Sequence, residues 1–146
     1  MTTTEDRQFR SVTRAARAWG PVAAWLALIF VLSAQPGLRI SPDPGVDLPI
    51  RHVAHVISYG VLTVLLTRAL NWGSSRRARW RLLLLAMVLA TLYGVSDEVH
   101  QTYVPNRTGH LLDVGWDLLG AIAGAAFLRL TPRRWLERAS VVARPE

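Results

Sequence analysis

The chain alternates between long apolar runs and short patches rich in arginine, proline or acidic residues. The apolar runs cover residues 19–34, 52–70, 82–100 and 111–130. As a helix, the last run would be about 30 Å long, which is the thickness of the hydrocarbon core of a bilayer. No strand pattern and no internal repeat accompanies these runs. The pattern therefore predicts an all-α integral membrane protein, a bundle of four transmembrane helices.

Three loops separate the predicted helices. Residues 35–51 are dense in helix-breaking residues, which predicts an irregular loop outside the membrane. Residues 71–81 form a short basic loop, and residues 101–110 a turn around Pro105-Asn106. The breakers of the first loop are Pro36, Gly37, Pro42, Pro44, Gly45 and Pro49.

Arginine indicates how the helices cross the membrane. Residues 1–18, the loop 71–81 and the C-terminal residues 131–146 are all rich in arginine. Because Lys and Arg are enriched on the cytoplasmic side, both termini are predicted to be cytoplasmic. The other two loops, which would face outward, contain only Arg39, Arg51 and Arg107. Trp19, Trp72, Trp80 and Trp135 lie beside the arginine-rich ends, as an interfacial belt would.

These boundaries predict a cytoplasmic arm over residues 1–18, a membrane domain over 19–130 and a cytoplasmic basic tail over 131–146. An arginine-rich start before a short apolar run also fits a signal peptide. Cleavage after Ser33-Ala34 would place Leu32 where a small residue is required, so we expect an uncleaved helix.

The formal charge of +7 is compatible with nucleic-acid binding. The arginines flank apolar runs, however, so the positive-inside rule accounts for them and no nucleic-acid partner is expected. The chain has no cysteine, which excludes disulfides and thiolate metal sites. The expected partner is the lipid bilayer, which the chain is expected to cross several times.

Ionisable residues gather between residues 94 and 120, at the ends of the third and fourth predicted helices. Such groups are costly in a bilayer and indicate a functional site. Under the predicted topology they face away from the cytoplasm. The cluster contains Asp97, Glu98, His100, Gln101, Arg107, His110, Asp113 and Asp117.

The second helix would add His52, His55 and Tyr59, which share one face at i, i+3 and i+7. A site role would make them titratable groups with a phenol donor. Alternatively, His52 lies among the headgroups and Tyr59 is an interfacial aromatic. His55 lies about one turn deeper, and we interpret it as functional.

Adjacent Asp97 and Glu98 would repel each other, so one of them could act as an acid or base. Alternatively, one of them pairs with Arg107 across the turn. Asp113 lies closer to this turn than Asp117 does, and we expect it to be the charge partner of Arg107. Asp117→Asn would then be neutral or mildly stabilising.

The remaining signals are structural or negative. Gly120 and Gly124 continue the aspartate face as a GxxxG pattern, which predicts close helix packing. Carboxylates with His55, His100 or His110 would suit a divalent cation, but no HExxH or comparable spacing occurs. No metal and no cofactor is therefore assigned. Neither a GxSxG nucleophile nor a P-loop is present.

Three groups of residues form a longer signature. They are Ser33-Ala34-Gln35-Pro36; Arg51-His52-Val53-Ala54-His55 with Tyr59; and Asp97-Glu98, Gln101, Pro105, Arg107, Asp113 and Gly120, spaced D-E-x2-Q-x3-P-x-R-x5-D…G. At these positions the chain resembles the VanZ-like family of small bacterial membrane proteins. Two positions depart from the family, which usually has Lys where His52 stands and Asn where Asp117 stands.

The resemblance implies a polytopic protein of the bacterial cytoplasmic membrane, and the founding member of the family is linked to teicoplanin-type glycopeptide resistance. It supplies no reaction. One hypothesis is a non-catalytic role at the outer face of the membrane, in glycopeptide resistance or envelope homeostasis. The alternative is an enzyme acting on a lipid-linked or phosphorylated substrate, such as cell-wall material, with His55 or Glu98 as acid or base and Arg107 binding the anion. The candidate functional cluster comprises His55, Tyr59, Asp97, Glu98, Gln101, Arg107 and Asp113.

Overall fold

The computed structural model describes residues 4–39, 41–71 and 80–131, with side chains from Val12 onward. Each helix contains a stretch long and apolar enough to cross a membrane, which confirms the predicted all-α membrane fold. In chain order the helices are α1 (Thr4–Ser33), α2 (Pro44–Leu70), α3 (Trp80–Gln101) and α4 (Leu111–Leu130).

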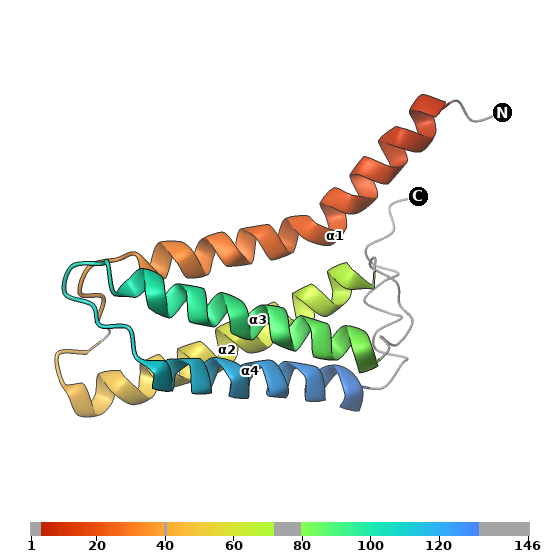
Figure 1. Cartoon of the computed structure of the whole chain (residues 1–146). Helices are drawn as coiled ribbons and strands as arrows, with labels where there is room; N and C mark the ends of the chain where they lie inside the picture. Colours follow the sequence, from red (N-terminus) through yellow and green to blue (C-terminus); the bar gives the residue numbers. More distant parts are fainter. Residues whose placement is uncertain (1–3, 40, 72–79, 132–146) are drawn as a thin grey trace.

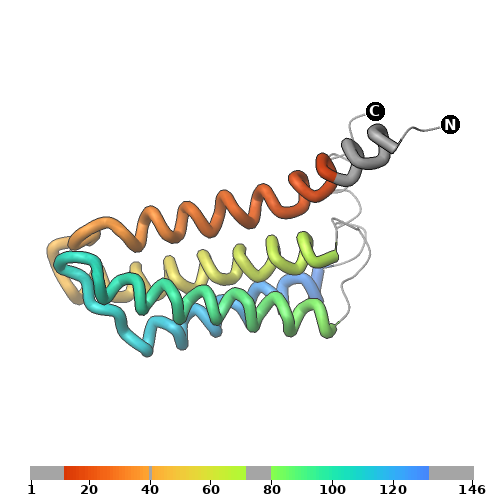
Figure 2. The backbone as a smooth tube through the Cα atoms, turned by 45° about the horizontal axis from the view of Figure 1, so that its top comes forward, coloured from red at the N-terminus to blue at the C-terminus, as the bar shows by residue number. Residues whose placement is uncertain are grey.

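Successive helices run in opposite directions, so α1 and α3 end where α2 and α4 begin (Figure 1). The helices α2, α3 and α4 contact one another, whereas α1 contacts α2 and, over a smaller area, α3. Towards its N-terminus α1 leans away from the other three helices (Figures 1 and 2). This helix contains Pro21, whose missing N–H permits a bend.

The helix α2 begins well before residue 52, so the prediction of an irregular loop over residues 35–51 is wrong for its second half. Asp43 is the N-cap, and its Oδ1 accepts a hydrogen bond from Gly45 N at 2.8 Å. Pro44 then occupies the first helical position, where a missing N–H costs nothing. The proline that sequence reasoning counted as a breaker therefore starts the helix, and Arg51 belongs to α2 and not to a loop.

The predicted first span began at Trp19, whereas α1 begins at Thr4 and so includes most of the predicted arm; the third and fourth predicted spans agree with the structure. The fourth, residues 111–130, coincides with α4, and the third differs from α3 by only a few residues. Parts of the predicted basic loop and tail lie outside the described residues, and the orientation of the bundle stays a prediction. The residues concerned are Trp72, Arg76, Arg77, Arg79, Arg133, Arg134, Trp135, Arg138 and Arg144.

Glycines bring α2 and α4 into backbone contact. A Cβ atom on Gly120 would meet the carbonyl oxygen of Val56, and one on Gly124 would meet that of Gly60. On the opposite helix, a Cβ atom on Gly60 would lie 3.1 Å from Gly120 O. The structure confirms the packing predicted from the GxxxG pattern, since only glycine permits this approach. The close contact places the residues just before Gly120 against those just before Gly60.

The buried positions between the helices hold small residues, such as Ala86, Ala90 and Ala121, together with Leu62 and Tyr59. Many large apolar side chains instead point outward on every helix. Large exposed apolar surfaces indicate contact with lipid or with a partner. In a bundle of four spans, this distribution fits helices surrounded by lipid.

Candidate functional site

The predicted site residues come together at the end of the bundle where α3 ends and α2 and α4 begin. Most of them are buried, although their side chains are polar or charged. The exposed fractions are 1% for Tyr59, 5% for Asp97, 5% for Glu98, 1% for Gln101, 5% for Asp113 and 0% for Asp117. Buried charges are stable only when paired, hydrogen-bonded or bound to a cation, so each one requires a partner.

His55 and Asp117 form the shortest side-chain contact of the site. The distance from His55 Nδ1 to Asp117 Oδ1 is 2.7 Å. Because an ionised carboxylate can only accept, Nδ1 donates to it and Nε2 becomes the basic nitrogen of the ring. Gly94 on α3 makes room for this carboxylate, since a Cβ atom there would meet Asp117 Oδ2.

Asp117 therefore has a partner that sequence reasoning did not assign. The expectation that Asp117→Asn is neutral rested on the shape and acceptor that Asn retains and on the removal of a deep charge, and it did not include this contact with His55. The missing signal was three-dimensional, because Asp117 meets His55 only through the glycine contact between α2 and α4.

Glu98 joins this pair from α3. Its Oε2 accepts a hydrogen bond from His110 N at 2.7 Å, whereas its Oε1 has no hydrogen-bond partner among the described residues. Ligand-type atoms of His55, Glu98 and Asp117 all lie within 4.8 Å of one another. We call these three residues the triad; each comes from a different helix.

Asp113 faces α2 and not the turn. Its Oδ2 lies 3.8 Å from Arg51 Nη2, and its Oδ1 lies 3.7 Å from His52 Nε2. The ring of His52 also stacks on Trp116, with centroids 4.7 Å apart. The predicted pairing of Asp113 with Arg107 is therefore wrong.

Arg51 is the residue that sequence reasoning left out of the site. It precedes His55 by four residues, so on a helix both occupy one face. The signal was present in the sequence, but it depends on α2 extending back to Pro44.

Arg107 fastens the turn to α1. Its Nε donates to Gln35 O at 3.1 Å and its Nη2 to Leu32 O at 3.0 Å, which satisfies carbonyls at the C-terminal end of α1. Its Nη1 donates to Gln101 Oε1 at 3.0 Å, and Gln101 Nε2 donates to Asp97 Oδ2 at 3.0 Å. The expected contact with an acidic residue across the turn thus runs through Gln101.

Burial and the nearby Arg51 cation lower the pKa of the Arg107 guanidinium from its ordinary value. It nevertheless remains a cation, because arginine is not deprotonated in proteins. With three of its nitrogen atoms donating to protein oxygens, Arg107 positions the turn.

Tyr59 lies on α2 about one turn further from the start of the helix than His55. The two rings are nearly parallel, with centroids 6.2 Å apart and an angle of 4° between the planes. The Tyr59 hydroxyl is buried without a hydrogen-bond partner among the described residues, whereas Tyr93 OH donates to Leu26 O at 2.8 Å. The sequence prediction of a shared face for His55 and Tyr59 is confirmed.

The cluster is not consumed in ion pairs. Three buried carboxylate oxygens, Asp97 Oδ1, Glu98 Oε1 and Asp117 Oδ2, have no hydrogen-bond partner within the described part of the chain. Unsatisfied buried acceptors are rare in native proteins and require an explanation. A site that handles protons or binds a cation provides one.

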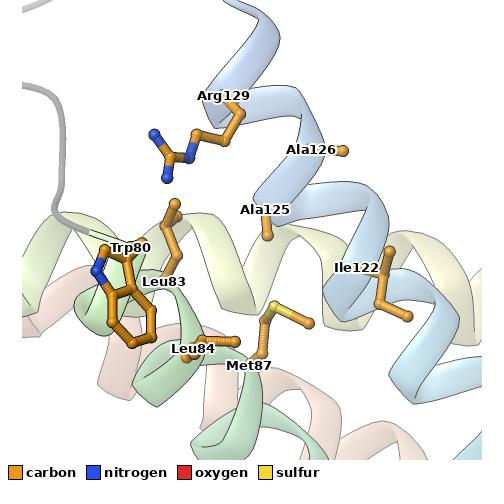
Figure 3. A pocket seen from close by; sticks show the side chains of 8 residues that line it. All are labelled: Trp80, Leu83, Leu84, Met87, Ile122, Ala125, Ala126 and Arg129. Carbon is orange, nitrogen blue, oxygen red and sulfur yellow. The ribbon is translucent and has the colours of Figure 1, made fainter.

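A shallow groove of about 350 Å³ lies at the opposite end of the bundle, between α3 and α4 (Figure 3). Its lining is mostly apolar, and Arg129 lies at one edge (Figure 3). Trp80, at the start of α3, also lies beneath the guanidinium of Arg81 at 5.5 Å. The residues that line this groove include one ionisable side chain, that of Arg129, and no carboxylate or imidazole.

A comparison with protein families identifies one match. The family model described as VanZ/LLP1 matches residues 6–132, which include α1 from Asp6 onward, the other three helices and the whole triad. No curated protein and no solved structure matches the chain.

Proposed function

The chain belongs to the VanZ/LLP1 family, and from this premise we propose that it is a membrane-embedded enzyme acting on a lipid-linked, phosphorylated envelope substrate. The observation that carries the proposal is the triad, in which an imidazole and two buried carboxylates from three helices converge. A purely structural ion-pair network would have used the carboxylate oxygens that this cluster leaves unpaired.

The proposed reaction is hydrolysis of a phosphoester or phosphoanhydride. Water adds across the phosphorus–oxygen bond, the triad accepts the proton that water loses, and the leaving oxygen takes up a proton in turn. His55 is oriented by Asp117, as an acid–base imidazole must be. Glu98 provides the second carboxyl group, held at one oxygen by His110 N.

A phosphorylated substrate is supported by two basic side chains near the triad, those of Arg51 and His52. The side chain of Arg51 is 32% exposed and that of His52 is 25% exposed, so both are accessible from outside the bundle. A guanidinium matches the geometry of phosphate oxygens and can bind two of them at once. Asp113 holds both basic residues on the side of the site where α4 begins.

A lipid-linked substrate is supported by the apolar surface beside the site. Leu111 and Leu112, at the start of α4, are 85% and 81% exposed. They follow directly after His110, whose N–H holds Glu98. A lipid chain can therefore lie against α4 with its phosphorylated headgroup beside Arg51 and His52. The outer face of the cytoplasmic membrane is proposed from the arginine distribution alone.

Phosphate release from purified protein tests the proposal. Polyprenyl phosphate, polyprenyl diphosphate and a diacyl phosphatidic acid are supplied in mixed micelles, and inorganic phosphate is measured. The parent protein should release phosphate from at least one of these, and His55→Phe should abolish the release. His100→Phe is the matched control, because His100 stacks on Phe30 at 4.6 Å and a phenyl ring preserves that stack. No release by the parent, or equal release by both variants, contradicts the proposal.

A non-catalytic role at the membrane surface, in glycopeptide susceptibility or envelope homeostasis, is the second candidate. It is favoured by the contacts of Arg107, which hold the turn against α1 instead of facing a substrate. Teicoplanin susceptibility of cells overexpressing the parent and His55→Phe separates the two. A resistance phenotype that His55→Phe retains at equal membrane expression supports the non-catalytic role.

A further inference from the structure

We infer that His55, Glu98 and Asp117 bind a divalent transition-metal cation, of which Zn²⁺ and Mn²⁺ are the representatives to test. This inference names a cofactor for the site of the proposed function. Binding of the cation does not depend on that function, but its role in hydrolysis does. No ligand spacing indicates such a site in the sequence, because the three residues come from three helices.

The donor atoms have the arrangement that a cation requires. One ligand atom from each residue lies within 4.8 Å of the other two. Three tetrahedral ligands, each about 2.1 Å from an ion, are about 3.4 Å apart. The separations between these ligand atoms therefore exceed those of a coordinated ion by at most about 1.4 Å.

Two buried acceptors point independently to a cation. Glu98 is 5% exposed and Asp117 is 0% exposed, yet Glu98 Oε1 and Asp117 Oδ2 have no hydrogen-bond partner among the described residues. The second oxygen of each carboxylate is held, Glu98 Oε2 by His110 N and Asp117 Oδ1 by His55 Nδ1. Each carboxylate is thus hydrogen-bonded at one oxygen and unpaired at the other.

Charge favours the same conclusion. Within the triad, two carboxylates face one imidazole. The guanidinium of Arg51 is directed to Asp113, which is not a member of the triad. Burying an uncompensated carboxylate is unfavourable, and a divalent cation offsets two of them at once. The imidazole nitrogen selects Zn²⁺ or Mn²⁺ over Ca²⁺ and Mg²⁺, which prefer oxygen ligands.

A three-residue site leaves coordination positions open. In the cation-bound state the protein ligands are His55, Glu98 and Asp117, and the remaining positions can hold water and a phosphate oxygen. With a cation bound, His55 would be a ligand and not the proton acceptor. The cation would lower the pKa of a coordinated water, whose proton would pass to a phosphate oxygen of the substrate.

Binding of Mn²⁺ alone tests the inference. Full-length protein in mild detergent is treated with EDTA, freed of the chelator and titrated with MnCl₂, and free Mn²⁺ is followed by electron paramagnetic resonance. We expect one bound Mn²⁺ per chain, with affinity weakened at least about tenfold by Glu98→Gln and by Asp117→Asn. Asp43→Asn is the matched control, because Asp43 is an exposed N-cap and Asn caps a helix equally well.

Pulsed electron paramagnetic resonance shows whether His55 coordinates the ion directly or only supports the other ligands. The bound Mn²⁺ of the parent should show coupling to a directly coordinated nitrogen, and His55→Gln should lack it. Absence of stoichiometric binding in the parent, or identical affinity in Glu98→Gln and the parent, overturns the site. Both carboxylate variants preserve side-chain shape, and melting temperatures confirm that they fold.

The same preparations separate this inference from the proposed function. Phosphate release that is equal in EDTA and in MnCl₂, without Mn²⁺ binding, overturns the metal site and supports the enzyme. Binding of Mn²⁺ without phosphate release supports the site and contradicts the enzyme.

Discussion

A single methyl group at Gly120 tests whether the close approach of α2 and α4 maintains the triad. In Gly120→Ala the new Cβ atom would lie 2.9 Å from Val56 Cα and 3.0 Å from Val56 C. Non-bonded carbon atoms prefer about 3.5–4.0 Å, so the two helices must separate by about 0.6 Å or more. The obstacle is backbone, which cannot rotate away as a side chain can.

The same separation acts on the site three residues earlier in α4. The His55–Asp117 contact of 2.7 Å would lengthen. With that added separation it would reach about 3.3 Å, beyond the usual N–H···O range of about 2.7–3.2 Å. Overpacking costs about 1–3 kcal/mol, and Gly120→Ala should therefore lose stability and the His55–Asp117 hydrogen bond together.

Gly115→Ala is the internal control. A Cβ atom on Gly115 meets nothing within 4 Å, and this residue lies on the same helix. Both variants share the higher helix propensity of alanine, up to about 1 kcal/mol, so their difference isolates the packing cost. Unfolding of both by sodium dodecyl sulfate in mild micelles, followed by tryptophan fluorescence, measures it. Equal stability of the two variants would refute the argument.

Three further predictions concern the site, the core and the topology. Asp117→Asn should lower phosphate release far more than Asp113→Asn does, which a turnover assay measures. Asp113→Asn should lower the stability of the protein by under about 1 kcal/mol, because the contacts of Asp113 are long and its partners are partly exposed; melting temperatures check this. Tyr93→Phe removes the hydrogen bond to α1 and should destabilise the protein by about 1 kcal/mol in the same detergent titration, whereas an unchanged midpoint would show that α1 is held elsewhere. A cysteine replacing Tyr103, which is 81% exposed, should react with an impermeant thiol reagent in intact cells, and one replacing Ser75 should not; the reverse labelling would place the triad on the cytoplasmic side.

The sequence by itself determined the class of fold and a set of candidate site residues. Four apolar runs predicted four helices, because a bilayer requires helices of a fixed length whose backbone groups are satisfied internally. Buried ionisable residues also identify themselves in a membrane sequence, since they are rare there. His55, Glu98 and Asp97 were therefore recognisable without coordinates, and the GxxxG pattern predicted the packing of α4.

Only the tertiary structure decided which of these residues meet. Partners on different helices are set by helix rotation and crossing, and α2 and α4 meet where Gly60, Gly120 and Gly124 allow their backbones to touch. Because Asp113 and Arg107 are close in the sequence, they were predicted to pair. In the structure Arg107 donates to carbonyl groups at the end of α1, and Asp113 faces Arg51. The triad could not be predicted from the sequence for the same reason. Its members lie on three different helices, and only three-dimensional packing brings their ligand atoms within 4.8 Å of one another.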